Sequence, residues 1–310
     1  MLLDDLREAC AAIADRSSSV RIEHARLAAY ARALAPSVAA QLAAPPDPEA
    51  ELLTGDREAR AGFWLCLDAI NFGSGWFPTL RKRPGRSGYF AVAIGVQEHF
   101  AGDGAPDARM LSGVEAAEVA AMLGQDPGHP LMALFAAALR DVGHHVSSEH
   151  DGSFAAVVDA AAAQRAVALV DRLAAWDAFA DTSSFQELRV PFLKRAQITA
   201  ADLHRSGVAD FIDLEELTLF ADNLVPHVLR VDGMLSYEPA LQDRIERGDR
   251  LDHGSPDEVA IRACALHAVE LLAAQLPGTR ACDLDLTLWN RGQAARYRAV
   301  PRHRTRCTAY

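Results

Sequence analysis

The first candidate for chemistry is the carboxylate of Asp222, which lies in the stretch 220–227 (FADNLVPH). Asp213 followed three residues later by Glu216 is typical of a capping box, so a helix is predicted from there to about residue 221. Pro226 favours an extended backbone at the residue before it, which ends that helix. Asp222 is therefore predicted in the last turn, where the helix terminus carries partial negative charge and disfavours a carboxylate. Such an aspartate is either a solvated loop residue or part of a pocket.

A second candidate is Lys194, in the stretch 190–198 (VPFLKRAQI). A helix is predicted to start here and to end at Gly207, a residue type common just after helix C-termini. The lysine then lies in the first turn, where the helix dipole disfavours a cation. This position indicates an acidic partner or an anionic ligand, and a plain surface lysine is the alternative.

Polar and aromatic residues gather at the end of a helix predicted over residues 57–70. Asp68 lies in its last turn, Asn71 follows three residues later, and a glycine-containing loop then carries Phe72 and Trp76. Such a mixture can build a ligand cradle. An aromatic loop pinned to the core is the alternative.

Two further clusters lie near the C-terminus. Asp285 and Trp289 are one turn apart on the last clearly predicted helix, so they share a face. The basic residues of the tail that follows include His303, Arg304 and Arg306. These cations, or a short basic loop at residues 81–86, could bind a phosphate. A solvated tail or loop is the alternative.

The elements that must position these side chains are predicted to be mainly α-helical. One small β element is predicted over residues 88–96, where apolar residues alternate between two glycines. Further helices are predicted over residues 112–124, 130–142 and 154–173, after a cap at Ser255 and after a cap at Asp283. The chain is predicted to form a single α-rich catalytic domain over residues 1–310, in which a lobe of residues 1–150 could pack on one of residues 151–310.

Composition narrows the function classes. A formal net charge of -11 argues against nucleic acid as a partner, because binding to phosphate backbones needs clustered Lys and Arg. The five cysteines are odd in number and widely spaced, which favours a reduced, cytoplasmic protein over a disulfide framework. No secretory signal or membrane span is predicted. Three histidines, His144, His145 and His150, do not share a helical face, so no metal is predicted.

Six stretches together resemble the queuosine salvage proteins, the queuosine 5′-phosphate N-glycosylase/hydrolases. The similar segments, in chain order, are 67–72 (LDAINF), 190–197 (VPFLKRAQ), 220–226 (FADNLVP), 257–264 (DEVAIRAC), 284–289 (LDLTLW) and 303–310 (HRTRCTAY). The sequence departs from the family at Asn223 and His227, where the family has Tyr and Gln. Both positions are expected among the substrate contacts.

The resemblance implies a helical fold similar to the helix-hairpin-helix DNA glycosylases. It implies hydrolysis of the N-glycosidic bond of queuosine 5′-monophosphate to queuine and ribose 5-phosphate, with no cofactor. The family's conserved Asp and Lys match Asp222 and Lys194 of this sequence.

The implied chemistry fits these residue types. Breaking an N-glycosidic bond develops positive charge on the ribose, as in glycoside hydrolysis. A carboxylate at Asp222 can stabilise that charge and orient or deprotonate water. Lys194 could keep Asp222 ionised or contact the phosphate. The leaving base is a 7-deazapurine that cannot be protonated at position seven, so the sugar side must contribute more.

The remaining candidates divide by residue type. Aromatic stacking on the base is expected from Phe72, Trp76 and Trp289. Hydrogen bonds to the base edge or its amino-diol arm are expected from Asp68, Asn71 and Asp285. The phosphate is expected at His303, Arg304 and Arg306. Two alternatives stay open: a glycosylase acting on DNA bases, and a helical binding protein without catalysis.

Overall fold

The computed structural model describes residues 2–44, 55–104 and 106–310. Helices dominate, and the described strands form two small antiparallel pairs, so the mainly α prediction is confirmed. The helices are α1 Leu2–Arg16, α2 Leu27–Ala43, α4 Arg57–Ala69, α5 Gly88–Asp103, α6 Ala108–Leu111, α7 Ala116–Leu123, α8 Pro130–Glu149, α9 Phe154–Asp159, α10 Ala166–Leu173, α11 Lys194–Arg205, α12 Leu224–Val231, α13 Pro239–Glu246, α14 Pro256–Ala273, α15 Ala281–Arg291 and α16 Ala295–Arg298. The strands are β1 Val20–Ile22, β2 Thr182–Phe185, β3 Leu188–Pro191 and β4 Leu235–Tyr237.

Each strand pair joins a different part of the chain. Strand β1 pairs with β4, with Val20 opposite Tyr237, and so ties the N-terminal region to the segment after α12. Strands β2 and β3 form a hairpin, with Thr182 opposite Pro191, that leads directly into α11. The hairpin therefore fixes the position at which α11 starts, and with it the position of Lys194.

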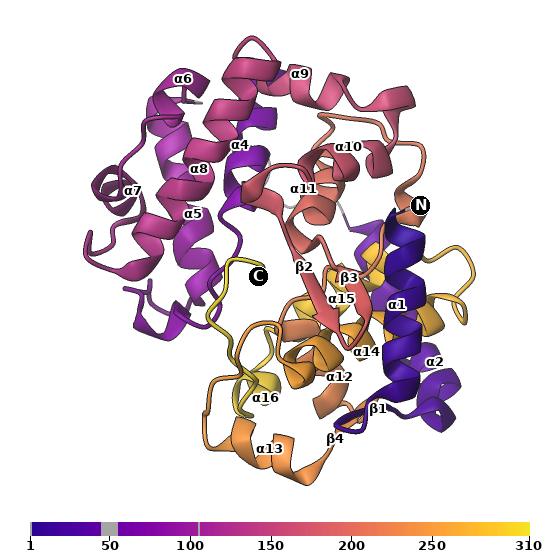
Figure 1. Cartoon of the computed structure of the whole chain (residues 1–310). Coiled ribbons are helices and arrows are strands. Elements are labelled where there is room, and N and C mark those ends of the chain that lie inside the picture. The colour runs from indigo at the N-terminus through magenta and orange to yellow at the C-terminus, as the bar shows by residue number, and fades with distance from the viewer. Residues whose placement is uncertain (1, 45–54, 105) are drawn as a thin grey trace.

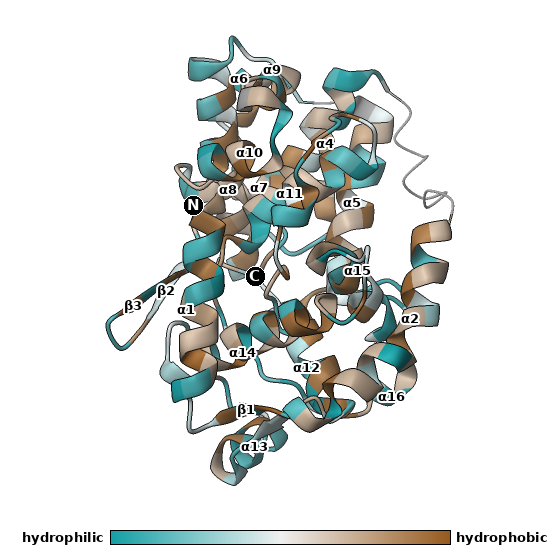
Figure 2. Cartoon of the chain, turned by 90° about the vertical axis from the view of Figure 1, so that its right-hand side faces the viewer, coloured by the Kyte–Doolittle hydropathy of each residue, from teal (hydrophilic) through white to brown (hydrophobic). Residues whose placement is uncertain are grey.

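Helix α14 lies at the centre of the core. Its start follows the prediction: the Ser255 side chain accepts a hydrogen bond from the Glu258 amide, and Pro256 is the first helical residue. It is buried along most of its length, and α1, α2, α12 and α15 pack around it. Helix α1 carries hydrophobic and hydrophilic residues on different faces, and its buried face packs on α14 (Figure 2).

Helix α4 connects this central group to the helices at the upper left of Figure 1. Asp56 caps it, accepting a hydrogen bond from the Ala59 amide at 2.9 Å. Helix α4 packs on α5, α8 and α9 and also on α11. Buried apolar residues from Leu3 to Tyr297 form one continuous cluster across both groups. The organisation of residues 1–310 as one domain or two lobes stays a prediction.

The C-terminal segment crosses the middle of the molecule after α16, as the yellow trace in Figure 1 shows. The Leu251 amide donates to the Arg304 carbonyl, and the Gly73 amide donates to the Tyr310 carbonyl, both at 2.9 Å. The side chain of Tyr310 is only 2% exposed. The end of the chain is therefore docked between the loop after α4 and the region before α14.

The predicted β element at residues 88–96 is wrong: this stretch is the first half of α5. The α5 sequence is apolar on more than one face, because it packs on both α4 and α7. A short apolar run of this kind does not distinguish a strand from a buried helix. Gly95 suits a helix here because a side chain at that position would crowd Leu123 of α7.

Other predicted helix limits are shifted. Helix α7 begins after Glu115, whose capping partner is Glu118, rather than after residue 112. Helix α8 continues through Gly143, where a side chain would collide with the backbone at Ser112, so this glycine serves close packing instead of ending the helix. The single helix predicted over residues 154–173 is broken into α9 and α10. In the described part of the chain, no helix has the length and apolar character to cross a bilayer.

Candidate active site

The backbone before Lys194 is held in an unusual conformation. Leu193 has a φ of +49°, and the left-handed region costs a residue with a side chain roughly 1–2 kcal/mol. Asp181 compensates: its carbonyl accepts from the Leu193 amide and its carboxylate from the Lys194 amide, both at 3.1 Å. An outlier fixed in this way beside a candidate catalytic residue is typical of a functional site.

The side chain of Lys194 is buried and turns toward the end of α4. Its Nζ donates to the carbonyl oxygen of Asn71 at 2.9 Å. Burial lowers the pKa of Lys194, and the carboxylates of Asp222 and Asp68 oppose that shift. The carboxylates of Asp222 and Asp68 therefore interact electrostatically with this lysine.

The other polar residues at the start of α11 clamp neighbouring segments. Arg195 donates to the carbonyl of Ala69 at 2.6 Å, which fixes the C-terminal end of α4. Gln197 accepts from the Thr218 amide at 2.9 Å and donates to the Thr218 hydroxyl at 3.0 Å. One helix start thus positions both the residues around Asn71 and the segment that leads to Asp222.

Asp222 lies at the beginning of a helix, so its predicted place in a last helical turn is wrong. Only residues 214–216 form a short 3₁₀ turn, the chain is then extended, and α12 starts at Leu224. The Asp222 Oδ1 accepts from the amides of Leu224 at 2.7 Å and Val225 at 3.1 Å. The helix dipole therefore stabilises this half-buried carboxylate instead of opposing it.

The helix predicted from residue 213 to about 221 does not form, because its capping residue makes tertiary contacts with another helix. Asp213 is a capping residue, but its carboxylate accepts from the amides of Ala166 and Val167 at the start of α10. The extended stretch 217–220 is held by Gln197 instead of forming a helix. Similarly, Asp283 is the third residue of α15, and its carboxylate accepts from the Arg280 amide.

A buried ion pair links the two candidate catalytic residues. Arg262 of α14 donates to both carboxylate oxygens of Asp181, at 3.1 and 2.6 Å. Its Nε donates to the carbonyl of Ala221 at 2.9 Å. Asp181 in turn accepts from the Lys194 amide. The Arg262–Asp181 pair therefore fixes the backbone at Lys194 and beside Asp222 together.

Three further carboxylates surround Lys194. Burial raises the pKa of Asp68 well above its usual value, and Asp202 adds to the rise. Burial also raises the pKa of Asp285, and the Asp222 carboxylate adds to it. The Oδ2 atom of Asp68 is buried without a hydrogen-bond partner, and Asp285 Oδ1 accepts from the Phe220 amide at 3.2 Å. The site thus combines one lysine with a set of carboxyl groups, some of which favour the neutral form.

The aromatic candidates occupy different environments. Trp289 is half-buried and meets Tyr89 and Phe90 of α5, with ring centroids 5.5 and 5.9 Å apart. Phe72 is buried, with its ring 5.0 Å from that of Phe135 and 5.0 Å from the Arg195 guanidinium. Trp76 is half-buried beneath the guanidinium of Arg306, at 5.4 Å. Trp289 shares its helix with Asp285 as predicted, whereas Phe72 is placed as a support under the Asn71 loop.

The remaining predicted residues, at α12 and in the tail, differ in their exposure to solvent. His303 is buried, and its carbonyl accepts from the Asn223 side chain at 3.2 Å. His227 is buried and hydrogen-bonded to the carbonyl of Tyr297 at 2.8 Å, and burial lowers its pKa to about 4. Arg304 and Arg306 are exposed. The structure thus brings Asn223 and His303 next to Asp222 and leaves Arg304 and Arg306 outside the buried cluster.

Several residues at the site were missed by sequence reasoning. Asp202 lies two helical turns after Lys194 on α11, a spacing that could have been read as a shared face. Tyr89 was assigned to a strand, yet its pKa is raised by burial and by Asp202 and Asp68, which places its hydroxyl near these carboxylates. Arg302 lies directly before the predicted tail cluster and is influenced by Asp222.

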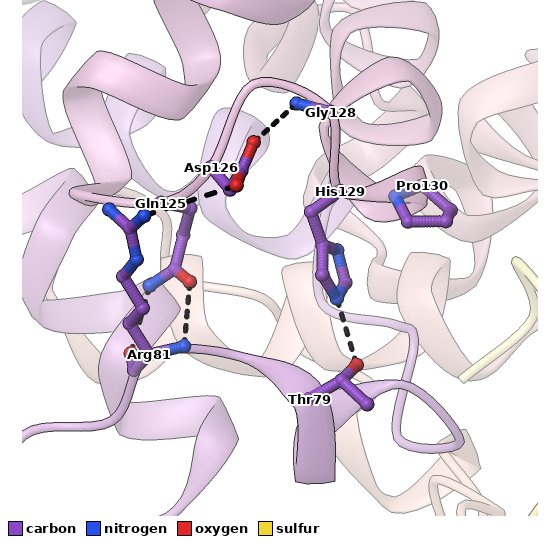
Figure 3. Close-up of a pocket in the computed structure, with 7 residues that line it drawn as sticks. All are labelled: Thr79, Arg81, Gln125, Asp126, Gly128, His129 and Pro130. Atoms are coloured by element: carbon purple, nitrogen blue, oxygen red, sulfur yellow. Dashed lines mark hydrogen bonds and ion pairs between the residues drawn. The ribbon is translucent and has the colours of Figure 1, made fainter.

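A surface pocket of about 430 Å³ lies elsewhere, at the start of α8 (Figure 3). His129 caps α8 there, accepting from the Leu131 amide through Nδ1, and its Nε2 is 2.9 Å from the Thr79 hydroxyl. Gln125 hydrogen-bonds both the amide and the carbonyl of Arg81. Arg81, the first residue of the basic loop considered for phosphate binding, lines this pocket, whereas the other predicted site residues do not. The polar groups of the pocket pair with one another.

The three histidines considered for metal binding have other contacts. His145 stacks on Trp176, with centroids 4.6 Å apart and an interplanar angle of 2°. Over the described ranges, no group of three or more His, Cys, Asp or Glu residues is arranged to hold a metal ion.

Taken together, the fold and site define a helical protein whose buried lysine is surrounded by carboxyl groups, one of them oriented by a helix N-terminus. This arrangement suits stabilisation of a developing positive charge and activation of water, as glycosidic bond hydrolysis requires. The family model for queuosine salvage proteins matches residues 52–310. The chain belongs to the queuosine salvage protein family, which confirms the resemblance found in the sequence.

Two individual relatives support this placement over nearly the full length of the chain, and a third over about half of it. A protein of Sphaerobacter thermophilus named queuosine 5′-phosphate N-glycosylase/hydrolase is 36% identical over 96% of this chain and 95% of its own. The protein of the same name from Mus musculus is 28% identical over 98% of both chains. That of Dictyostelium discoideum is 32% identical over 54% of both chains.

Proposed function

We propose that this protein hydrolyses the N-glycosidic bond of queuosine 5′-monophosphate, releasing queuine and ribose 5-phosphate. The names of its relatives support the substrate and the reaction. The single structural observation that carries the proposal is the Asp222 carboxylate, held by two backbone amides at the start of α12 and interacting electrostatically with the buried Lys194.

In the proposed mechanism, Asp222 acts on the sugar side of the substrate. As the bond between C1′ and the base nitrogen lengthens, its electron pair moves to the base and positive charge develops on the ribose. The Asp222 carboxylate stabilises this charge and takes a proton from the water whose oxygen bonds to C1′. The released base takes up a proton at a ring nitrogen, so that one water is consumed for each queuine formed.

Lys194 is proposed to provide the positive charge beside Asp222 and the neighbouring carboxyl groups. Its ammonium balances the negative charge of Asp222, while its hydrogen bond to the Asn71 carbonyl limits its movement. The clamp formed by Asp181 and Arg262 is proposed to hold Lys194 and Asp222 at a fixed position relative to each other. Preorganised charges of this kind avoid rearrangement during the reaction.

The base is proposed to lie toward α4 and α15. Asp68, Asn71 and Asp285 offer hydrogen bonds to its edge or its amino-diol arm. A carboxyl group whose pKa is raised by burial can remain neutral and donate a hydrogen bond. Trp289 offers a half-buried aromatic face one turn from Asp285 for stacking. Phe72 and Trp76 complete the proposed aromatic set, with Phe72 acting from beneath the loop.

The experiment is incubation of the purified protein with queuosine 5′-monophosphate, with separate incubations on a duplex DNA containing damaged bases and on buffer alone. Queuine from the nucleotide and no base from the DNA is the expected outcome. Release of a base from DNA alone would favour the glycosylase alternative, and no release from either would favour a binding protein.

The five cysteines are free and buried, in keeping with the proposed cytoplasmic location.

A further inference from the structure

The backbone on both sides of Arg302 is fixed to the segment that carries Asp222. The Arg230 guanidinium donates to the carbonyl of Pro301 at 2.7 Å. The Asn223 side chain donates to the carbonyl of His303 at 3.2 Å. Asn223 directly follows Asp222, and Arg230 lies on α12, which Asp222 caps. The backbone at Arg302 is therefore held alongside α12, between Arg230 in its last turn and Asn223 at its start.

The other cations near the site already have partners. Lys194 donates to the Asn71 carbonyl. Arg205 pairs with Asp202 at 3.1 Å and donates to the Cys282 carbonyl at 3.2 Å. Arg262 is saturated by Asp181 and the Ala221 carbonyl.

Arg302 differs from these cations. Its side chain is half-buried, yet its guanidinium makes no hydrogen bond or ion pair with any residue of the described part of the chain. Burial lowers the pKa of Arg302, while the Asp222 carboxylate opposes the shift, so the two groups influence one another. A half-buried guanidinium without partners is matched to a planar or tetrahedral anion, to which it can donate two parallel hydrogen bonds.

The nucleotide supplies an anion on the sugar side. A carboxylate placed at the anomeric carbon repels a nearby phosphate, so a cation is needed to bind the phosphate in a chain with net charge -11. The exposed Arg304 and Arg306 lie outside the buried cluster, and Arg306 rests on Trp76. The geometry points to Arg302 as the residue that binds the 5′-phosphate of the substrate and sets the preference for nucleotide over nucleoside. This inference rests on the proposed function.

The test compares Arg302→Gln with the wild type on queuosine 5′-monophosphate and on queuosine. Loss of a charge-assisted hydrogen bond should raise KM and lower kcat/KM for the monophosphate about 10- to 100-fold. The value for the nucleoside should change less than about 2-fold, because the nucleoside lacks the phosphate. Arg302→Lys, which keeps the charge without the two-pronged geometry, should give an intermediate loss. Arg298→Gln, which removes an exposed arginine four residues earlier, should behave as wild type.

A binding measurement separates this inference from the proposed function. Calorimetry with ribose 5-phosphate should show weaker binding to Arg302→Gln than to the wild type and to Arg298→Gln, with unfolding temperatures showing that each variant is folded. If the wild type does not release queuine but this difference is observed, the proposed function fails while the phosphate site stands. Unchanged ribose 5-phosphate affinity in Arg302→Gln, equal losses on nucleotide and nucleoside, or transfer of the effect to Arg306→Gln would each overturn the inference.

Discussion

Replacing Asp222 with Asn separates the charge of this residue from its structural role. Asn keeps the oxygen that accepts from the Leu224 and Val225 amides at 2.7 and 3.1 Å, and Asn and Asp are comparable N-caps. The substitution therefore removes only the favourable interaction of the charge with the helix dipole, about 0.3–1 kcal/mol. Since folded domains are stable by roughly 5–15 kcal/mol, Asp222→Asn should remain folded.

The effect on catalysis should be far larger than the effect on stability. Loss of a general base or of a transition-state charge partner lowers turnover by about 10²- to 10⁴-fold, equivalent to roughly 3–5 kcal/mol of barrier. Because the side chain keeps its size and its hydrogen bonds to α12, KM should change little. We expect kcat for queuine release to fall by at least about 100-fold, with an unfolding temperature within about 4 °C of wild type.

The assay is steady-state queuine release followed by chromatography, with thermal unfolding of each protein measured in parallel. Asp243→Asn, on the exposed face of α13, is the matched control and should retain full activity. Asp222→Ala removes both the charge and the cap, so it should lose about 1 kcal/mol more stability than Asp222→Asn. A folded Asp222→Asn protein that keeps more than about one tenth of wild-type kcat would refute the assigned role, because a tenfold change is only about 1.4 kcal/mol.

Four other predictions follow from the same contacts. Lys194→Met should fold but lose about 100-fold or more in kcat, because the carboxyl groups lose their shared cation; wild-type turnover would count against this role. Asp181→Asn removes the carboxylate that accepts two hydrogen bonds from the buried Arg262 guanidinium and should cost about 3–5 kcal/mol in denaturant unfolding, whereas a loss below about 1 kcal/mol would argue against the clamp. Burial alone would raise the pKa of Glu258, but His253 and Arg262 lower it to about 2, so about 3 kcal/mol of stability present above pH 4.5 should be lost toward pH 2; Glu258→Gln should flatten that acid limb, and an unchanged limb would contradict the assignment. Queuine release should persist in excess chelator, and restoration of a chelated enzyme by zinc or magnesium would reopen the question of a metal.

The sequence predicted correctly where local signals and tertiary contacts agree. Residues 190–197 indicated a helix start with the lysine in its first turn, and α11 begins at Lys194. The Ser255 cap and the first proline of α14 were also predicted, because both act within one turn of the backbone. These features depend on neighbours in the sequence, so a single sequence contains them.

Prediction failed where distant residues decide the local structure. Asp213 carries a capping signal, but the helix that it caps begins 47 residues earlier in the sequence, at Ala166. Asp222 was therefore predicted at the end of a helix, whereas it lies at the start of one. Helix α5 was taken for a strand because its apolar residues face two neighbours at once, a pattern without a clear helical period.

The tail shows a third kind of limit. Its basic residues were recognised from the sequence. In an extended segment, however, alternate side chains face opposite sides, and the sequence alone does not show which set packs against the rest of the protein. The buried set proved to be His303, Thr305 and Cys307, with Arg304 and Arg306 exposed. Arg302 was overlooked because its place is fixed by a distant contact: the Asn223 side chain, 80 residues away in sequence, bonds the carbonyl of the neighbouring His303.

The most direct test of the central claim is a time course of both products from queuosine 5′-monophosphate in phosphate-free buffer. We predict that queuine and ribose 5-phosphate appear in a 1:1 ratio, at a rate proportional to the concentration of wild-type protein. Absence of queuine, or queuine that forms without an equal amount of ribose 5-phosphate, would contradict the proposal that this site hydrolyses the N-glycosidic bond.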